Sequence, residues 1–234
     1  MTASGDEASD RGGTGGWRVS HALAAFGAGV LAAVAASAAV WSGGVTVFEA
    51  FAVVGATQTL VTIAAVAWFA RTAGREPLGL RPAASDAAFL FLGAALAVAV
   101  SWVTYLVVQV VFRGEAPVQS VVLVADEARG TAARVAVVVV TVLLAPVAEE
   151  LVFRGVLLRA LQHRFSARVT LFTTAAAFGL AHLALDPDAA VAVPALFVVG
   201  LVLAAQVQRR GRLSPAVFTH MGFNLLGVVA LLAS

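Results

Sequence analysis

Long apolar runs, separated by short polar turns, restrict this chain to a small set of folds. The most extreme run is VAVVVVTVLL at 135–144, where a single threonine is the one polar side chain. A helix of about 20 apolar residues spans the hydrocarbon core of a bilayer and satisfies its own backbone hydrogen bonds there. We therefore predict an all-α, polytopic transmembrane bundle of about seven spans. The predicted spans lie near 19–41, 46–70, 87–112, 132–158, 169–185, 190–208 and 214–233.

The composition agrees with a membrane protein. The chain is 61% hydrophobic and 12% charged, whereas a soluble domain is about 45–50% apolar and about 25% charged. Although the isoelectric point is near 10.3, the basic residues lie at the span ends, so we predict a lipid bilayer and no nucleic acid as partner. All basic residues are arginines, which together with the abundant Ala, Val and Gly suggests a prokaryotic source. The chain has no cysteine, which excludes disulfides and a thiol nucleophile.

The charge of the connecting segments predicts the orientation. Arginines gather before the first span and after the second, fourth and sixth, whereas the other connections mix arginines with acidic residues. The positive-inside rule then predicts a multi-pass cell-membrane protein with a cytoplasmic N-terminus and an outside C-terminus. The arginines on the predicted cytoplasmic side are Arg11, Arg18, Arg71, Arg75, Arg81, Arg159, Arg164, Arg168, Arg209, Arg210 and Arg212.

Three parts are expected along the chain. Residues 1–16 are small, polar and Gly-rich and are expected to form a disordered tail. Residues 17–131 are expected to hold the N-terminal transmembrane helices, with a short amphipathic helix in the long loop at 113–131. Residues 132–234 are expected to form the functional core. Within that core, Pro146 should kink the fourth span or start a new helical segment.

Charged side chains within the fourth span need an explanation, because each costs about 2.5–3.5 kcal/mol on insertion scales. Glu150 and Arg154 are spaced i, i+4, so they can form a structural ion pair on one helix. That pairing leaves Glu149 without a local partner, beside an apolar wall formed by Phe153. A carboxyl group in such surroundings suits a general acid or base.

Polar groups on two later spans can reach Glu149. Glu149 and His182 are equally far from the basic turn at 163–168, about 21 Å along each helix, so two antiparallel neighbours would bring them to one level. His220 and Asn224 share a face of the last span. Residues of this kind are either hydrogen-bonding contacts between helices or, taken together on three helices, a functional site.

Three motifs carry these residues. EELVFR (149–154) fits E-E-x-x-x-R, FGLAH (178–182) fits F-x-x-x-H, and HMGFN (220–224) fits H-x-x-x-N. In this order on polytopic spans they resemble the CAAX protease and bacteriocin-processing enzyme (CPBP) family of intramembrane proteases, prenyl-protease type. The resemblance implies an intramembrane catalytic cavity, conical and open to the cytoplasm. It also implies the site residues: Glu149 as the catalytic glutamate, Glu150, Arg154, His182, His220 and Asn224 as further catalytic-site groups, and Phe178 in substrate binding.

The expected reaction is endopeptidase hydrolysis in a membrane-associated protein or peptide, similar to that of a CAAX prenyl protease. Water is the expected nucleophile; Glu149 would take its proton with help from His182. His220 and Asn224 would then donate to the oxyanion. This mechanism requires no cofactor.

A metalloprotease is the competing mechanism, because two histidines and one glutamate also match a catalytic zinc set. Glu149, His182 and His220 would then hold a divalent metal such as Zn, although the chain has no H-E-x-x-H motif.

Two alternatives belong to other classes of function. One is a non-catalytic membrane scaffold or bacteriocin-immunity protein of the same fold. The other is a proton-coupled transporter, in which Glu, Arg and His would form a relay. A transporter predicts paired inverted repeats, and none is evident in the sequence. The substrate and the oligomeric state are left open.

Overall fold

The computed structural model describes residues 16–41, 43, 45–72, 78–115, 120–127 and 130–233. All regular structure in these residues is helical, and seven helical segments are long and apolar enough to cross a membrane, as predicted. The predicted disordered tail lies outside the described residues, apart from its last position. The elements are α1 (Val19–Trp41), α2 (Val47–Thr72), η1 (Ala84–Ala87), α3 (Ala88–Val110), α4 (Ser120–Glu127), α5 (Thr131–Val138), η2 (Val139–Leu144), α6 (Ala145–Glu150), η3 (Leu151–Leu157), α7 (Leu158–Gln162), α8 (Ala167–Leu185), η4 (Pro187–Ala192), α9 (Val193–Arg210) and α10 (Ser214–Ala233).

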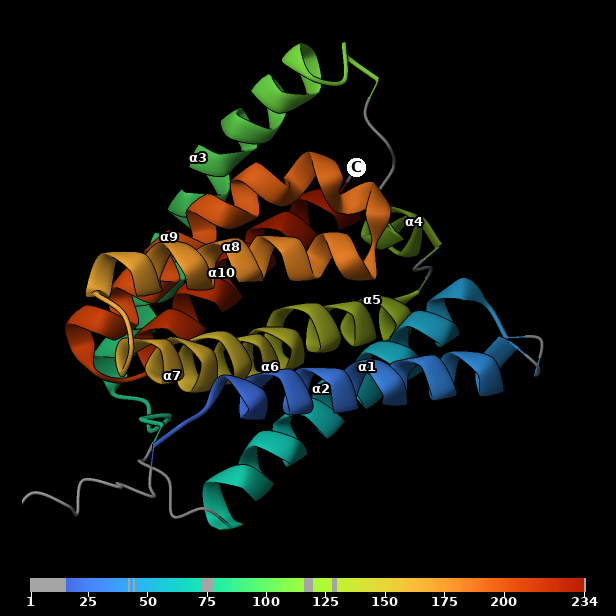
Figure 1. Cartoon of the computed structure of the whole chain (residues 1–234). Helices are drawn as coiled ribbons and strands as arrows, with labels where there is room; N and C mark the ends of the chain where they lie inside the picture. Colours follow the sequence, from blue (N-terminus) through green and yellow to red (C-terminus); the bar gives the residue numbers. More distant parts are fainter. Residues whose placement is uncertain are drawn as a thin grey trace, which may run out of the picture.

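The fourth span, α5 to α7, is the centre of the bundle. It is the most buried of the seven candidate spans and contacts α1 and α2 on one side and α8, α9 and α10 on the other (Figure 1). The first two spans pack on each other, as do α8 and α9, and α3 packs on α10. The part of the fourth span from 151 to 156 is therefore buried among other helices.

Two π-helical segments, η2 and η3, interrupt the fourth span on either side of α6. The backbone N–H of Ala145 bonds the carbonyl of Val140, five residues back. In this register the next donor would serve the carbonyl of Thr141, but that donor position is Pro146, which has no N–H. The carbonyl of Thr141 instead accepts a hydrogen bond from Asn224 Nδ2 on α10 at 2.8 Å. The disturbance predicted at Pro146 therefore appears as a change of helical register that begins α6, and the span stays continuous.

Glycines allow α3 and α10 to approach closely. A Cβ atom at Gly93 would overlap the backbone carbonyl of Thr219, and one at Gly222 would overlap the carbonyl of Leu90. Small residues at such a crossing are the usual means of tight packing between transmembrane helices. This contact fixes the position of α10, which carries the HMGFN motif.

A second ion pair ties the start of the third span to the turn between α9 and α10. The carboxylate of Asp86 is fully buried and accepts two hydrogen bonds from the guanidinium of Arg212, at 2.6 and 2.7 Å. Arg212 also donates to Ser214 Oγ at 2.8 Å, at the first residue of α10. Bidentate pairs of this kind are strong and geometrically specific. The pair therefore holds the beginning of α10 in place.

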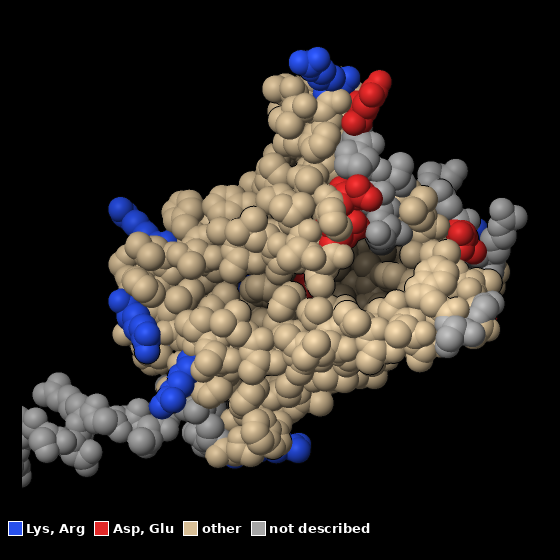
Figure 2. Space-filling view, turned by 45° about the vertical axis from the view of Figure 1, so that its right-hand side comes forward, with Lys and Arg blue, Asp and Glu red and all other residues tan. Residues whose placement is uncertain are grey.

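Charge is unevenly distributed over the surface in Figure 2. Most of the basic side chains in this view lie at the left-hand end, where the fourth and sixth spans end in Figure 1. The acidic side chains lie in the right-hand half, and the surface there is hollowed between the upper and lower groups of helices. This asymmetry follows the pattern from which the orientation is predicted.

Replacing Asp86 by Asn should lower the melting temperature by several degrees. The amide has one oxygen to accept a hydrogen bond from Arg212 in place of two, and its NH₂ group would face the guanidinium, which is also a donor. Thermal unfolding in detergent, followed by circular dichroism, measures the effect. Asp188→Asn is the matched control, since Asp188 is exposed, and it should leave the melting temperature unchanged. Equal melting temperatures for Asp86→Asn and the wild type would show that the pair does not stabilise the fold.

Candidate active site

A fully buried ion pair lies at the middle of the bundle. Glu150 Oε1 and Arg154 Nη1 are 2.8 Å apart, and neither side chain is exposed, which confirms the predicted pairing. Arg154 Nη2 donates to the carbonyl of Gly200 on α9 at 3.2 Å. Its guanidinium also lies over the ring of Phe178 on α8, 4.4 Å from the centroid, in a cation–π contact. One arginine thus links three spans.

His220 on α10 joins this pair. Its Nδ1 lies 3.0 Å from Glu150 Oε1. Since a carboxylate only accepts, Nδ1 carries the proton. The opposite ring nitrogen, Nε2, then faces Glu149 and lies 3.6 Å from its Oε2. Glu150 therefore orients His220 while it neutralises Arg154.

His182 approaches Glu149 from α8 in the same manner. Its Nδ1 donates to the carbonyl of Phe178, one turn earlier, at 2.9 Å. Its Nε2 lies 3.9 Å from Glu149 Oε2. The prediction that Glu149 and His182 reach one level in the membrane is thereby confirmed.

The two adjacent glutamates have opposite surroundings. The Glu149 side chain is 27% exposed, whereas that of Glu150 is fully buried. Glu149 Oε2 has no hydrogen-bond partner among the described residues, and the two Nε2 atoms lie beyond direct hydrogen-bonding distance. Two polar groups more than about 3.5 Å apart can be linked by a water molecule that hydrogen-bonds to both. A water molecule between these atoms would therefore be in contact with one carboxylate oxygen and two imidazole nitrogens.

The same three side chains are the possible metal ligands expected from the sequence. Nδ1–H bonds to a carbonyl or a carboxylate are typical of ligating histidines, so the donor chemistry fits a divalent ion. Ligand atoms around one tetrahedral zinc lie about 3.4 Å apart, and the separations from Glu149 to His182 and His220 are longer. Within the described part of the chain, no group of three such residues is arranged as a metal cluster.

Phe178 lies beneath the site. It is fully buried, and its ring makes edge contacts with His182, His220 and Phe153 at centroid distances of 4.8, 5.6 and 5.3 Å. Together with its cation–π contact to Arg154, these contacts make it the packing centre of the motif residues. The family resemblance implies a role for Phe178 in substrate binding, whereas its burial favours a role in positioning the histidines.

Asn224 lies one turn beyond His220 and contacts a different part of the fourth span, the carbonyl of Thr141. One of its amide N–H groups is therefore engaged between helices. The contacts that reach Glu149 come from His182 and His220. The expected role of Asn224 in binding an oxyanion remains a prediction.

Gly200 is a part of the site that none of the sequence motifs contains. A Cβ atom there would come within 2.9 Å of Ala175 Cα, so glycine allows α9 to approach α8. The close approach brings the Gly200 carbonyl to Arg154. In the sequence it is one glycine among many apolar residues, and no local pattern marks it.

A known family matches the part of the chain that carries these residues. Residues 131–226 match the family described as "Rce1-like: Type II CAAX prenyl endopeptidase Rce1-like". The matched segment begins with the fourth span, ends within α10 and contains all the site residues expected from the sequence. The match confirms the resemblance inferred from the three motifs. No curated protein and no solved structure matches the chain significantly.

The two glutamates should respond differently to the same change. Glu150→Gln leaves a buried, uncompensated Arg154 and should destabilise the protein by about 3–5 kcal/mol. Glu149→Gln removes a partly exposed carboxylate whose Oε2 has no hydrogen-bond partner among the described residues, so it should leave stability nearly unchanged. Melting temperatures of the two purified variants compare the effects. Equal destabilisation would contradict the division between a structural and a site-facing glutamate.

Proposed function

We propose that this multi-pass membrane protein is an intramembrane endopeptidase, because residues 131–226 match the Rce1-like family of type II CAAX prenyl endopeptidases. It hydrolyses a peptide bond in a membrane-associated protein or peptide. The observation that carries the proposal is the convergence of two imidazole Nε2 atoms, from His182 and His220, on Oε2 of Glu149. This site lies on the spans that bear the family motifs.

Glu149 acts as the general base in the proposed reaction. Its partly exposed carboxylate takes a proton from water, and the water oxygen attacks the carbonyl carbon of the scissile bond. The tetrahedral intermediate then collapses, the C–N bond breaks, and the proton on Glu149 passes to the leaving amine. The products are a carboxylic acid and a free amine.

The two histidines have different partners, and their proposed roles differ accordingly. His182 Nδ1 donates to a neutral carbonyl, so the neutral ring keeps Nε2 as an acceptor that helps orient the water. His220 Nδ1 donates to the Glu150 carboxylate, and its Nε2 faces Glu149. In the proposed reaction the His220 ring donates from Nε2 to the developing oxyanion when it carries both protons.

Phe178 and Asn224 support this arrangement in the proposed mechanism. Phe178 holds both imidazole rings at their edges. Asn224 fixes α10 against the fourth span through the Thr141 carbonyl, and its amide has a second N–H that can contribute to the oxyanion site.

A divalent metal, if one is used, would be held by Glu149, His182 and His220. Such an ion would supply Lewis-acid polarisation of the scissile carbonyl and a more acidic bound water. The glutamate mechanism predicts that chelators leave turnover unchanged. Loss of turnover on chelation, with recovery on adding Zn, would replace it with the metal-dependent mechanism.

Turnover tests the function directly. Host membranes carrying the wild type, Glu149→Gln or Glu115→Gln are compared for new protein termini by mass spectrometry. Glu115 is exposed and lies outside the three motifs, so Glu115→Gln should match the wild type. Glu149→Gln should reduce cleavage by about 10²–10⁴-fold, the usual contribution of a general base.

Retained cleavage by Glu149→Gln would exclude Glu149 as the base. If wild-type membranes contain no protein-dependent termini, although the protein is folded and abundant, the endopeptidase proposal fails and a scaffold or immunity role replaces it. The cleaved proteins themselves would identify the substrate class.

The proposed orientation places the N-terminus in the cytoplasm and the C-terminus outside, supported by the arginine-rich end of the molecule. With this orientation the hollow in Figure 2, which lies in the acidic half, opens away from the cytoplasm. The cavity implied by the family resemblance opens to the cytoplasm, so the orientation needs a direct test.

Since the chain has no cysteine, single-cysteine variants report orientation cleanly. An impermeant maleimide should label Asp188→Cys in intact cells. It should label Arg164→Cys only after the membrane is opened. Both substituted residues are exposed. The reverse pattern would invert the orientation and turn the hollow toward the cytoplasm.

A further inference from the structure

Gln206 brings a polar side chain into an otherwise apolar stretch of α9, since residues 193–205 carry no hydrogen-bonding side chain. Its Nε2 donates to Thr219 Oγ1 on α10 at 2.9 Å. Its Oε1 is buried and has no hydrogen-bond partner among the described residues. Burial of an unpaired carbonyl destabilises a fold, so packing alone would favour an apolar side chain at this position. The hydrogen bond to α10 is what an amide adds here.

Thr219 directly precedes His220, the residue of α10 that reaches both glutamates of the site. The Thr219 side chain is fully buried, and His220 is 3% exposed. Adjacent residues on a helix point about 100° apart, so a contact that holds Thr219 toward α9 fixes the direction in which the His220 ring leaves α10.

We propose that Gln206 is a positioning residue for His220. Its hydrogen bond to Thr219 sets the rotation of α10 that brings His220 Nδ1 within 3.0 Å of Glu150 Oε1. The catalytic consequence of this role rests on the proposed peptidase function, whereas the orientation of the ring does not.

The packing of α3 on α10 does not set this rotation by itself. A Cβ atom at Gly93 would overlap the Thr219 carbonyl, so the two backbones touch at this level. Such a contact fixes the distance between two helices, whereas a hydrogen bond also depends on direction. His220 and Asn224, on the same stretch of α10, both bond the fourth span. Gln206 adds a directional contact from a different helix, so α10 is held from two sides.

The helix that carries Gln206 is fixed to the same buried ion pair. The carbonyl of Gly200 accepts a hydrogen bond from Arg154 Nη2 at 3.2 Å. Gln206 lies six residues further along α9, or about 9 Å along the helix axis. The contacts therefore form a closed ring, which runs from Arg154 through α9 and Gln206 to α10 and returns through His220 and Glu150.

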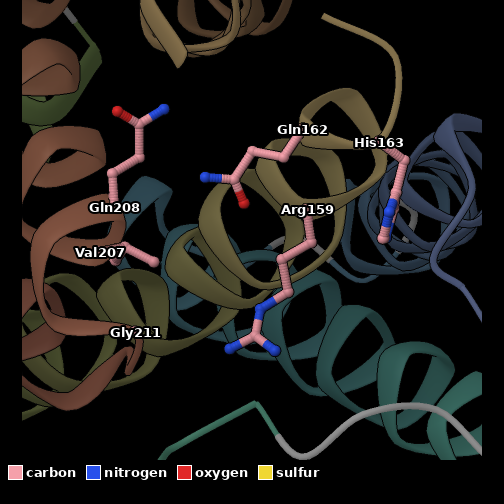
Figure 3. A pocket seen from close by; sticks show the side chains of 6 residues that line it. All are labelled: Arg159, Gln162, His163, Val207, Gln208 and Gly211. Atoms are coloured by element: carbon pink, nitrogen blue, oxygen red, sulfur yellow. The ribbon is translucent and has the colours of Figure 1, made fainter. Parts of the chain in front are cut away.

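Gln208, two residues further along α9, provides a matched control. Together with Val207 and Gly211 it lines a pocket of about 260 Å³ between the end of α9 and the end of the fourth span (Figure 3). Its Nε2 donates to the carbonyl of Ala167, at the start of α8, at 3.0 Å. Both glutamines thus hydrogen-bond a neighbouring helix, but the bond of Gln208 goes to α8 and leads away from His220.

The orientation of His220 is measured by NMR on the full-length protein in nanodiscs, with histidine labelled with ¹⁵N. The chain has four histidines, so substitutions assign the ring signals. In the wild type the Nδ1–H of His220 should give an N–H correlation, because its hydrogen bond to buried Glu150 slows exchange with water. Gln206→Met keeps the length of the side chain and removes the hydrogen bond, and it should abolish this correlation. Gln208→Met should preserve it.

Variants of Thr219 test the same bond from its other end. Thr219→Val removes the hydroxyl and should abolish the His220 correlation, whereas Thr219→Ser keeps the hydroxyl and should preserve it. The double variant Gln206→Met/Thr219→Val should resemble each single variant, because the two changes remove one interaction. A correlation that persists in Gln206→Met, or an equal loss in Gln208→Met, would overturn the positioning role.

The catalytic consequence is measured as kcat and KM on a peptide that spans a cleavage site found in the membrane comparison. Gln206→Met should lower kcat about 10–100-fold and leave KM nearly unchanged, since a small misplacement of a reacting group can cost about 10²-fold. An unchanged kcat would overturn this part of the proposal. If the wild type cleaves nothing, the endopeptidase function fails, while the NMR comparison still shows whether Gln206 orients His220.

Discussion

A buried ion pair in an apolar bundle is the constraint on which the rest of this structure depends. Glu150 and Arg154 lie where neither charge can reach water, so the groups that contact the pair must come from the protein. Three contacts come from other spans: the Gly200 carbonyl, the Phe178 ring and the imidazole of His220. Glu150 Oε2 and Arg154 Nε have no hydrogen-bond partner among the described residues. The contacts that the pair does make bring four spans together at one level.

The neighbouring glutamate gains its surroundings from this assembly. Consecutive residues on a helix point about 100° apart, so when Glu150 faces the buried arginine, Glu149 faces a different direction. The histidine that contacts Glu150 through one nitrogen presents the other to Glu149. The imidazole ring of His220 thus connects the Glu150–Arg154 pair with Glu149, the proposed catalytic group.

The sequence predicted most of this arrangement because the physical rules involved are local. The length of each apolar run sets a span, the i, i+4 spacing sets the Glu150–Arg154 pair, and the helical rise sets the common level of Glu149 and His182. The Asp86–Arg212 pair was missed because its partners are 126 residues apart and no local spacing relates them.

The π-helical segments were missed for another reason. The apolar pattern of the fourth span is nearly continuous, so it carries no period that distinguishes α from π register. The partner of Asn224 depends on this register together with the missing N–H of Pro146. A break in the helical hydrogen bonding at Pro146 is therefore predictable from the sequence. That the carbonyl without a helical donor belongs to Thr141 is not predictable, because it depends on the π register.

The π register of η2 has a consequence for the direction of Glu149, the proposed catalytic glutamate. A π turn takes more residues than an α turn, so the segment shifts the helical phase of everything that follows it relative to α5. If residues 139–144 took the α register with the same number of residues, Glu149 would turn relative to α5 by about one residue position, or about 100°. The direction in which Glu149 points thus depends on the backbone register of an apolar stretch that contains no charged group.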